Sequence, residues 1–135
     1  MEARTLITHM NNQTEYKIIE RSLVELVIES WRFAKTFREM LTKLTLKEDY
    51  TRCRGRYLWY RRRLDEILDS LGLRIVEIEP GETYDPGMAV NPVNIEDFDS
   101  HDILKIEYVL EPIIMNESQI IKTGSIILTK GVNDT

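Results

Sequence analysis

The sequence predicts an α+β protein in which an N-terminal helical hairpin precedes a small, mostly antiparallel β domain. Up to Gly72, apolar residues recur every three or four positions, as on one face of a helix. After residue 73, short runs rich in β-branched residues alternate with turn residues, which is typical of strands. Two prolines and two glycines within 80–90 exclude a continuous helix or a long strand there. The predicted parts are an arm over 1–11, the hairpin over 12–72, the β domain over 73–130 and a tail over 131–135.

A capping-box pattern, Asn12-Gln13-Thr14-Glu15, predicts the start of the first helix. An apolar seam follows at alternating spacings of four and three residues, and only Ser30 interrupts it. The apolar members of this seam are Leu23, Val27, Ala34, Phe37, Leu41 and Leu44. Val24, Ile28 and Trp31 form a second apolar row beside it, so the face is wide enough for a helical bundle.

A second capping-box pattern, Thr45-Leu46-Lys47-Glu48, predicts that the first helix ends near Leu44 and that a second helix begins. The second helix carries an apolar seam of its own, which stops at Gly72, and a glycine at this point predicts a left-handed C-terminal cap. Two helices shield such faces incompletely, so they need cover from another copy or from the β half folded back; a dimeric four-helix bundle is the favoured solution. The candidate bundle and dimer residues are Leu23, Val27, Trp31, Phe37, Leu41, Tyr57, Tyr60 and Leu64.

The β half is predicted from short apolar runs separated by turn residues. Pro112 lies inside the longest run and predicts an edge or a bulge there, since proline cannot donate to a sheet. An acidic loop over 91–102 precedes that run, and Val93, Ile95 and Phe98 are expected to pin it to the domain. The predicted strands are 74–78, 103–115, 119–122 and 125–128.

Composition indicates a soluble, cytoplasmic protein without disulfide bonds. The chain has 135 residues, a formal net charge of −5 and a single cysteine, Cys53, which is expected to be a packed thiol. No stretch reaches the roughly 18 consecutive apolar residues of a membrane-spanning helix, and the N-terminus lacks the apolar core of a signal peptide.

The sequence carries no motif of an established catalytic chemistry. Phosphate-binding glycine loops, nucleophile elbows, paired-cysteine motifs and HExxH zinc motifs are all missing. The acidic run 97–102 lacks the glycine and the distal glutamate of an EF-hand loop. We therefore expect a protein that is not an enzyme and that uses neither a cofactor nor a metal.

Six arginines on the second helix leave two interpretations open. They are Arg52, Arg54, Arg56, Arg61, Arg62 and Arg63, interleaved with Tyr57, Trp59 and Tyr60. The first interpretation is a solvated flank with pairs such as Arg61 to Asp65, and it is favoured because both tyrosines fall on the apolar seam. The second is a nucleic-acid-binding regulator that contacts phosphates through this face. A dimeric scaffold without further activity is a third possibility.

The order of the parts resembles the GrpE family of nucleotide exchange factors over roughly residues 20–130. Residues 64–72 resemble the family's helix end before the first strand. Tyr84-Asp85-Pro86 stands where the family has a Phe-Asp-Pro or Leu-Asp-Pro turn, and 106–130 aligns without a gap on the closing β segment. Lys122 falls on a position usually held by arginine, and Leu110 falls on a hydrophobic one.

The resemblance implies a homodimeric co-chaperone, active in protein folding and the stress response, whose β domain binds the ATPase domain of a DnaK-type chaperone and promotes ADP release. It implies that Tyr84, Asp85 and Pro86 form a turn that sets the angle of the β domain. Gly55, near a family glycine, is implied to allow close packing in the bundle. The implied chaperone-binding residues are Leu110, Ile113, Ile114, Met115, Lys122 and Ser125.

Two departures from the family pattern narrow what the resemblance implies. Only residues 1–22 precede the bundle seam, so the family's long paired helix and any thermal sensing by it are not carried over. Pro112-Ile113-Ile114 replaces a Lys-Gly-Tyr segment, and Lys122-Thr123-Gly124 replaces an Arg-Pro-Ala-like one. Both changes fall where the family meets its chaperone, which indicates a divergent or dedicated partner.

Overall fold

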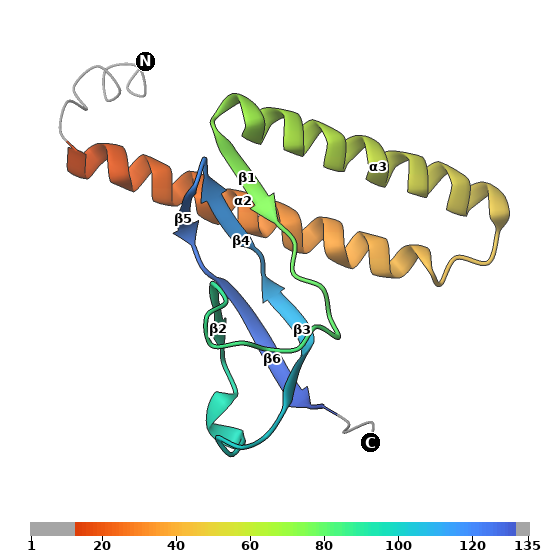
Figure 1. Cartoon of the computed structure of the whole chain (residues 1–135). Coiled ribbons are helices and arrows are strands. Elements are labelled where there is room, and N and C mark those ends of the chain that lie inside the picture. The colour runs from red at the N-terminus through yellow and green to blue at the C-terminus, as the bar shows by residue number, and fades with distance from the viewer. Residues whose placement is uncertain (1–12, 132–135) are drawn as a thin grey trace.

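Two long helices lie side by side and form a hairpin, as Figure 1 shows. The computed structural model describes residues 13–131, within which α2 spans Gln13–Leu41 and α3 spans Lys47–Ser70. The predicted arm over 1–11, the predicted cap at Asn12 and residues 132–135 of the predicted tail lie outside the described residues. The predicted break between the helices is confirmed, because α2 ends at Leu41.

The two ends of α3 test two predicted caps. The predicted capping box at Thr45 is wrong: the residue before the helix is Leu46, and no side chain caps the first turn. At the other end, Gly72 has a φ of 73° and donates its N–H to the carbonyl of Asp69 at 3.0 Å. This left-handed residue confirms the predicted end of the helix, because glycine adopts positive φ without steric cost.

The β half consists of two three-stranded sheets, so the α+β class is confirmed. The first sheet is antiparallel and has the order β1-β4-β5. In the second, β6 lies between β2, its parallel partner, and β3, its antiparallel partner. Buried Pro112 separates β3 from β4, so the run predicted as one strand is two. The strands are β1 (Leu73–Val76), β2 (Val90–Pro92), β3 (Leu104–Glu111), β4 (Ile113–Asn116), β5 (Gln119–Lys122) and β6 (Gly124–Lys130), with a short 3-10 helix η1 (Ile95–Asp97).

Two apolar clusters join the sheets to the helices. One contains Trp31 of α2 together with the inner faces of β3 and β6. The other contains Val27 and its neighbours on α2, Leu68 of α3, and Leu73 and Ile114 of the first sheet. The chain's own β half, one of the two expected covers, therefore covers the face of α2 that carries Val27 and Trp31, and cover by a second copy stays a prediction. Three of the predicted dimer residues, Val27, Trp31 and Leu41, are buried within the single chain.

The proline- and glycine-rich segment 80–90 belongs to the β half and runs along the free edge of β3. The N–H of Gly81 donates to the carbonyl of Ile106 at 2.7 Å, and that of Tyr84 donates to Leu104 at 2.8 Å. The predicted turn is present, since the N–H of Met88 donates to the carbonyl of Asp85 at 2.9 Å. The segment lies within the β half, where it joins β1 of the first sheet to β2 of the second, and its role in setting the angle of the β domain stays a prediction.

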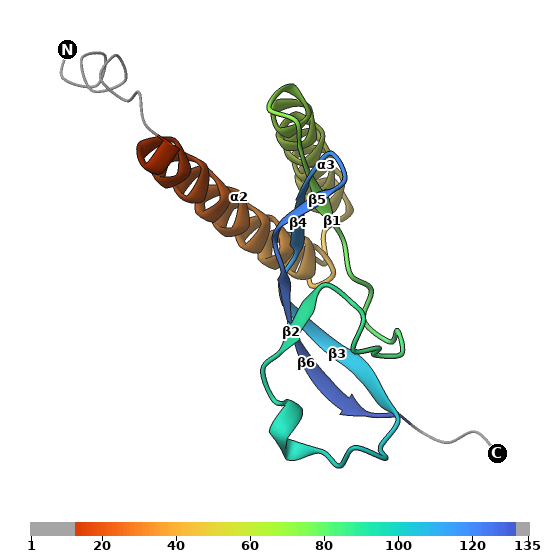
Figure 2. The ribbon, with the colours of Figure 1, turned by 60° about the vertical axis from the view of Figure 1, so that its left-hand side comes forward.

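The β half projects from one side of the hairpin, as the rotated view in Figure 2 shows. The first sheet lies next to the helices and the second extends away from them. The link from α3 to β1 is short, because Leu73 follows Gly72 directly. Contacts between α2 and the strands, rather than a long linker, therefore position the second sheet.

Candidate partner-binding surfaces

A polar junction holds the β half against both helices. The indole Nε1 of Trp31 donates to both carboxylate oxygens of Glu77, at 3.1 and 3.2 Å. Arg61 of α3 donates to the same carboxylate at 3.0 Å. Glu77 follows β1 directly, so one carboxylate joins α2, α3 and the end of the first strand.

Lys35 forms the second part of this junction. Its ammonium group donates to the carbonyl of Val109 at 3.1 Å and lies 3.4 Å from the centre of the Tyr108 ring. A cation over an aromatic face is attracted by the ring quadrupole, most strongly where little water competes. The side chain of Lys35 is only 13% exposed, so this contact ties α2 firmly to β3.

The carboxylate of Glu111 pairs with basic groups from two directions. Arg32 of α2 lies 3.2 Å from one oxygen, and Lys122 of β5 lies 3.3 Å from the other. The side chain of Lys122 remains 41% exposed, so it is accessible to a partner while it is paired within the chain. Nothing in the local sequence around Lys122 indicates this pairing, because Glu111 lies on a different strand.

The structure brings most of the implied chaperone-binding residues together near Glu111. Lys122 pairs with Glu111, and Ser125 lies opposite it in the strand register. Leu110, Ile113, Met115, Lys122 and Ser125 are all half-buried and line β3, β4, β5 and β6 around Pro112. Ile114 is fully buried, with 0% exposure, and packs against the helices. Ile114 is therefore excluded as a direct contact residue.

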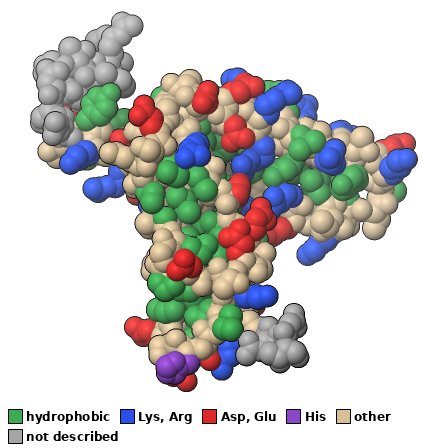
Figure 3. All heavy atoms as spheres, in the orientation of Figure 1, with side chains coloured by type: hydrophobic (Ala, Val, Ile, Leu, Met, Phe, Trp, Pro, Cys, Tyr) green, Lys and Arg blue, Asp and Glu red, His purple; other side chains and the backbone are tan. Residues whose placement is uncertain are grey.

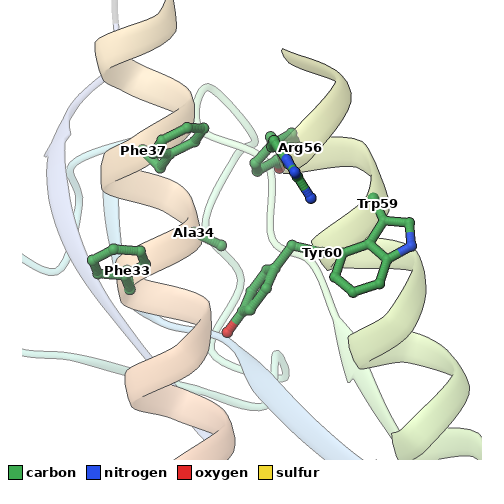
Figure 4. A pocket seen from close by; sticks show the side chains of 7 residues that line it. Phe33, Ala34, Phe37, Arg56, Trp59 and Tyr60 are labelled. Atoms are coloured by element: carbon green, nitrogen blue, oxygen red, sulfur yellow. The ribbon is translucent and has the colours of Figure 1, made fainter. Parts of the chain in front are cut away.

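An apolar groove of about 230 Å³ lies between α2 and α3, as Figure 4 shows. Phe33 at its edge is 71% exposed, and Trp59 is 51% exposed. Phe33 lies off the predicted seam, but it shares a seven-residue spacing with Ile19, Leu26 and Met40, which are also exposed apolar residues of α2; this spacing could have identified it from the sequence. The groove is lined by Phe33, Ala34 and Phe37 of α2 and by Arg56, Tyr57, Trp59 and Tyr60 of α3.

The other predicted bundle residues separate into two groups. Phe37, Tyr57 and Tyr60 are half-buried in the groove, whereas Leu23 and Leu64 pack against the cluster that joins the hairpin to the first sheet. Gly55 is exposed, and a Cβ added there would meet nothing within 4 Å in the same chain. The implied close packing at Gly55 does not occur within the chain and would require a second one.

Most of the six arginines on α3 are paired with carboxylates. Arg61 lies 4.0 Å from Asp65, as predicted, and Arg63 lies 2.8 Å from Glu66. Arg52 and Arg62 also have acidic partners. Within residues 13–131, Arg54 and Arg56 form no ion pair. These pairings favour the interpretation of a solvated flank, which Figure 3 shows along α3.

Several other features bear on function. Neither α2 nor α3 combines the length and the apolar composition that crossing a bilayer requires. Among residues 13–131, no three His, Cys, Asp or Glu side chains are grouped as a metal site. Cys53 is half-buried and free.

Comparisons of the chain with protein-family models, with curated proteins and with solved structures identify no match. The structural class of the protein therefore rests on its own structure, which is α+β. The corner around Glu111 and the groove between the helices are the surfaces on which a functional proposal rests.

Proposed function

We propose that the chain is a GrpE-like nucleotide exchange factor, which binds the ATPase domain of a DnaK-type chaperone and promotes ADP release. One observation carries the proposal: a helical hairpin bears a small β unit on its side, and the closing strands of that unit present Lys122 at the position of the family's arginine. The order of parts in the sequence and their arrangement in space both support it.

The mechanism is thermodynamic linkage rather than bond chemistry. A β unit that binds the open chaperone more tightly than the closed one shifts the chaperone toward the open state. Linkage then requires that the exchange factor weaken the binding of ADP to the chaperone by the same factor by which ADP weakens the binding of the exchange factor. A coupling free energy of about 1–3 kcal/mol changes the affinity by roughly 5- to 150-fold.

The contact surface in this proposal is the corner around Glu111. Lys122 offers a half-exposed ammonium group to a carboxylate of the chaperone, and Leu110 and Ile113 supply apolar area beside it. Glu111 keeps Arg32 as a partner at 3.2 Å when Lys122 turns outward. The exchange of partners by Lys122 therefore leaves no buried carboxylate unpaired, which keeps its cost small.

The dimer in this proposal forms through the groove between α2 and α3. Phe33 and Trp59 are large apolar side chains that a single chain leaves exposed, and a second hairpin would bury both. Two hairpins then form the four-helix bundle, and the open space beside Gly55 accommodates a helix of the second chain.

Release of fluorescent ADP from a DnaK-type chaperone tests the exchange activity. Addition of the protein should accelerate release, and Lys122→Ala should reduce this acceleration while the protein stays folded, because Glu111 retains Arg32. Lys130→Ala is the matched control, since Lys130 lies at the far end of β6 and is 68% exposed. Unchanged ADP release with every DnaK-type chaperone of the same cell rejects the proposal. Binding to the chaperone without release of ADP would instead identify the protein as a dimeric scaffold without exchange activity.

Measurement of the mass in solution tests the dimer separately. Light scattering should give about twice the chain mass of 15.9 kDa. Phe33→Asp should yield the monomer, because it buries an unpaired charge in the interface. Ile120→Asp, at an exposed position on β5, should leave the mass unchanged. A monomeric wild type at high concentration contradicts the dimer.

Nucleic-acid binding is the second candidate function, and one observation favours it. Arg56 lines the groove together with exposed Trp59, and neither Arg54 nor Arg56 pairs with a carboxylate within residues 13–131. Phosphate contacts release counterions, so binding should weaken steeply as salt rises. The absence of any DNA or RNA mobility shift at low salt rejects this candidate.

A further inference from the structure

The far end of the β half holds a second hollow, away from both surfaces used above. It measures about 580 Å³ and lies between the turn at 83–86 and the loop at 95–104. Its apolar lining comes from Tyr84, Pro86, Ile95, Phe98, Ile103 and Leu104. Tyr84 and Phe98 pack against the core of the second sheet and form the inner part of this lining.

Two isoleucines in the lining of the hollow remain exposed in the folded chain. Ile95 is 41% exposed and Ile103 is 52% exposed. Contiguous apolar surface beside a hollow is typical of an interaction site, because folding alone gives no reason to leave it in water.

The chain around the hollow is mostly acidic, with Lys130 as a basic neighbour 3.9 Å from Asp102. Residues 75–104 contain no lysine or arginine. They contain eight acidic residues; Glu77 lies at the helix junction, whereas Asp85, Glu96, Asp97, Asp99 and Asp102 belong to the turn and the loop that border the hollow. Asp99 and Asp102 are part of the lining. Figure 3 shows acidic side chains at this end of the molecule. Such a field attracts cations and repels polyanions, so nucleic acid and anionic membranes are poor occupants.

The loop that forms the hollow is held in place by the strands. The side chain of Asn94 donates to the carbonyl of Leu128 at 2.9 Å and accepts from the N–H of Leu128 at 2.8 Å. The N–H of Gly131 donates to the carbonyl of Ile103 at 2.7 Å. A surface ordered in advance loses little conformational entropy on binding, which favours affinity.

We propose that this hollow binds a cationic segment of a partner protein. The segment inserts one or two apolar side chains between Ile95 and Ile103, and lysines or arginines on either side face the acidic rim. Lysine and arginine alone would leave the isoleucines in water, and an uncharged apolar segment would leave the acidic rim without counter-charges. The proposal does not depend on exchange activity, because the hollow and the corner around Glu111 are lined by different residues.

The probe is a short fluorescein-labelled peptide in which leucine and tryptophan alternate with lysine. Fluorescence anisotropy of this peptide with the full chain should show saturable binding that weakens as salt rises. The double variant Ile95→Ser, Ile103→Ser should lose about tenfold or more in affinity, because two apolar contacts are removed. Val93→Ser and Ile120→Ser are matched controls, which remove exposed apolar side chains that do not line the hollow.

Three results would overturn the proposal. The first is equal peptide affinity for the wild type and the Ile95, Ile103 double variant, with both proteins giving the same thermal midpoint. The second is equal binding of a peptide in which serine replaces leucine and tryptophan, since charge alone would then explain the affinity. The third is the assembly of open-ended oligomers that the same double variant abolishes, since the occupant would then be a second copy, bound through its arginine-rich α3. None of these readouts involves ADP release, so failure here is separable from failure of the proposed function.

Discussion

Glu77 is the residue on which contacts from both helices converge. It accepts from Trp31 of α2 and from Arg61 of α3. Its neighbour Ile78 is part of the core of the second sheet. The carboxylate is 42% exposed, so its ion pair with Arg61 contributes modestly, whereas the buried indole depends on it as a hydrogen-bond acceptor. A surface carboxylate thus completes the polar contact of a core side chain.

Trp31→Phe tests this contact. Phenylalanine keeps most of the buried apolar area but removes the N–H donor, so the free energy of unfolding should fall by about 1–2 kcal/mol. Trp59→Phe is the matched control and should change stability by less than about 0.5 kcal/mol, since Trp59 is 51% exposed. Urea unfolding at equal protein concentration measures both. Equal stability of the two variants would show that the indole N–H contributes nothing.

Gly124 is a second residue whose role comes from its surroundings. A Cβ at this position would lie 2.7 Å from Cδ1 of Ile78 and 2.9 Å from the carbonyl oxygen of Glu111. Gly124→Ala should therefore destabilise the fold by about 1–3 kcal/mol, because the backbone of β3 would have to shift. Gly87→Ala, whose nearest contact would be 3.7 Å, should be nearly neutral. Thermal unfolding that ranks the two variants the other way would contradict the close packing at Gly124.

At the scale of the element, α3 differs from α2 in how little of it the chain buries. Leu68 is its only buried residue, whereas α2 contributes six residues to the core, among them Val24, Val27 and Trp31. The i,i+3 and i,i+4 ion pairs of α3 supply some support to an exposed helix, each a few tenths of a kcal/mol. The proposed dimer would add burial to this helix.

Gly55→Ala tests whether α3 lacks packing neighbours at Gly55 within one chain. Alanine favours a helix over glycine by about 0.5–1 kcal/mol, and nothing within 4 Å obstructs its Cβ. In a monomeric Phe33→Asp background, Gly55→Ala should therefore raise the free energy of unfolding by that amount. In the wild-type background it should weaken the dimer if a second chain packs closely on Gly55. Destabilisation of the monomer would show that α3 is not open at this position.

At the scale of the whole molecule, the angle between hairpin and β half depends on contacts between α2 and β3. Lys35 contacts Val109 and Tyr108, and Arg32 pairs with Glu111 one turn away. The segment 80–90 makes its hydrogen bonds within the β half. We therefore expect the contacts between α2 and β3, rather than the proline-rich turn, to set the orientation of the β half.

Lys35→Ala should broaden this orientation, since it removes the hydrogen bond to Val109 and the contact with the Tyr108 ring. Pulsed electron spin resonance between labels on native Cys53 and on Asp99→Cys measures the distance distribution within one chain when labelled protein is diluted with unlabelled protein. The distribution should widen in Lys35→Ala and stay unchanged in Pro86→Gly. A wider distribution in Pro86→Gly together with an unchanged one in Lys35→Ala would show that the turn sets the angle between the hairpin and the β half.

Particular residues show why some features were predictable from the sequence. The spacing of apolar residues and the glycine at 72 predicted both helices and the end of α3, because helix periodicity and positive φ are local properties. The cap at Thr45 was predicted by the same reasoning and is absent, since the residue at the cap position is Leu46, whose side chain has no hydrogen-bond acceptor. The hollow near Ile95 was not predictable, because it forms between loops that meet only in the folded chain.

The sequence by itself determined where the two helices and most of the strand segments lie and which faces of the helices are apolar, because those properties depend on neighbours a few residues away, whereas β2 and the division of 103–115 into β3 and β4 came only from the structure. Only the tertiary structure decided what covers those faces. Trp31 meets Glu77 across 46 positions of the chain, and Lys35 meets Val109 across 74. An apolar stripe requires cover but carries no information about its partner, so a β half folded onto α2 and a second copy satisfy the same pattern equally well.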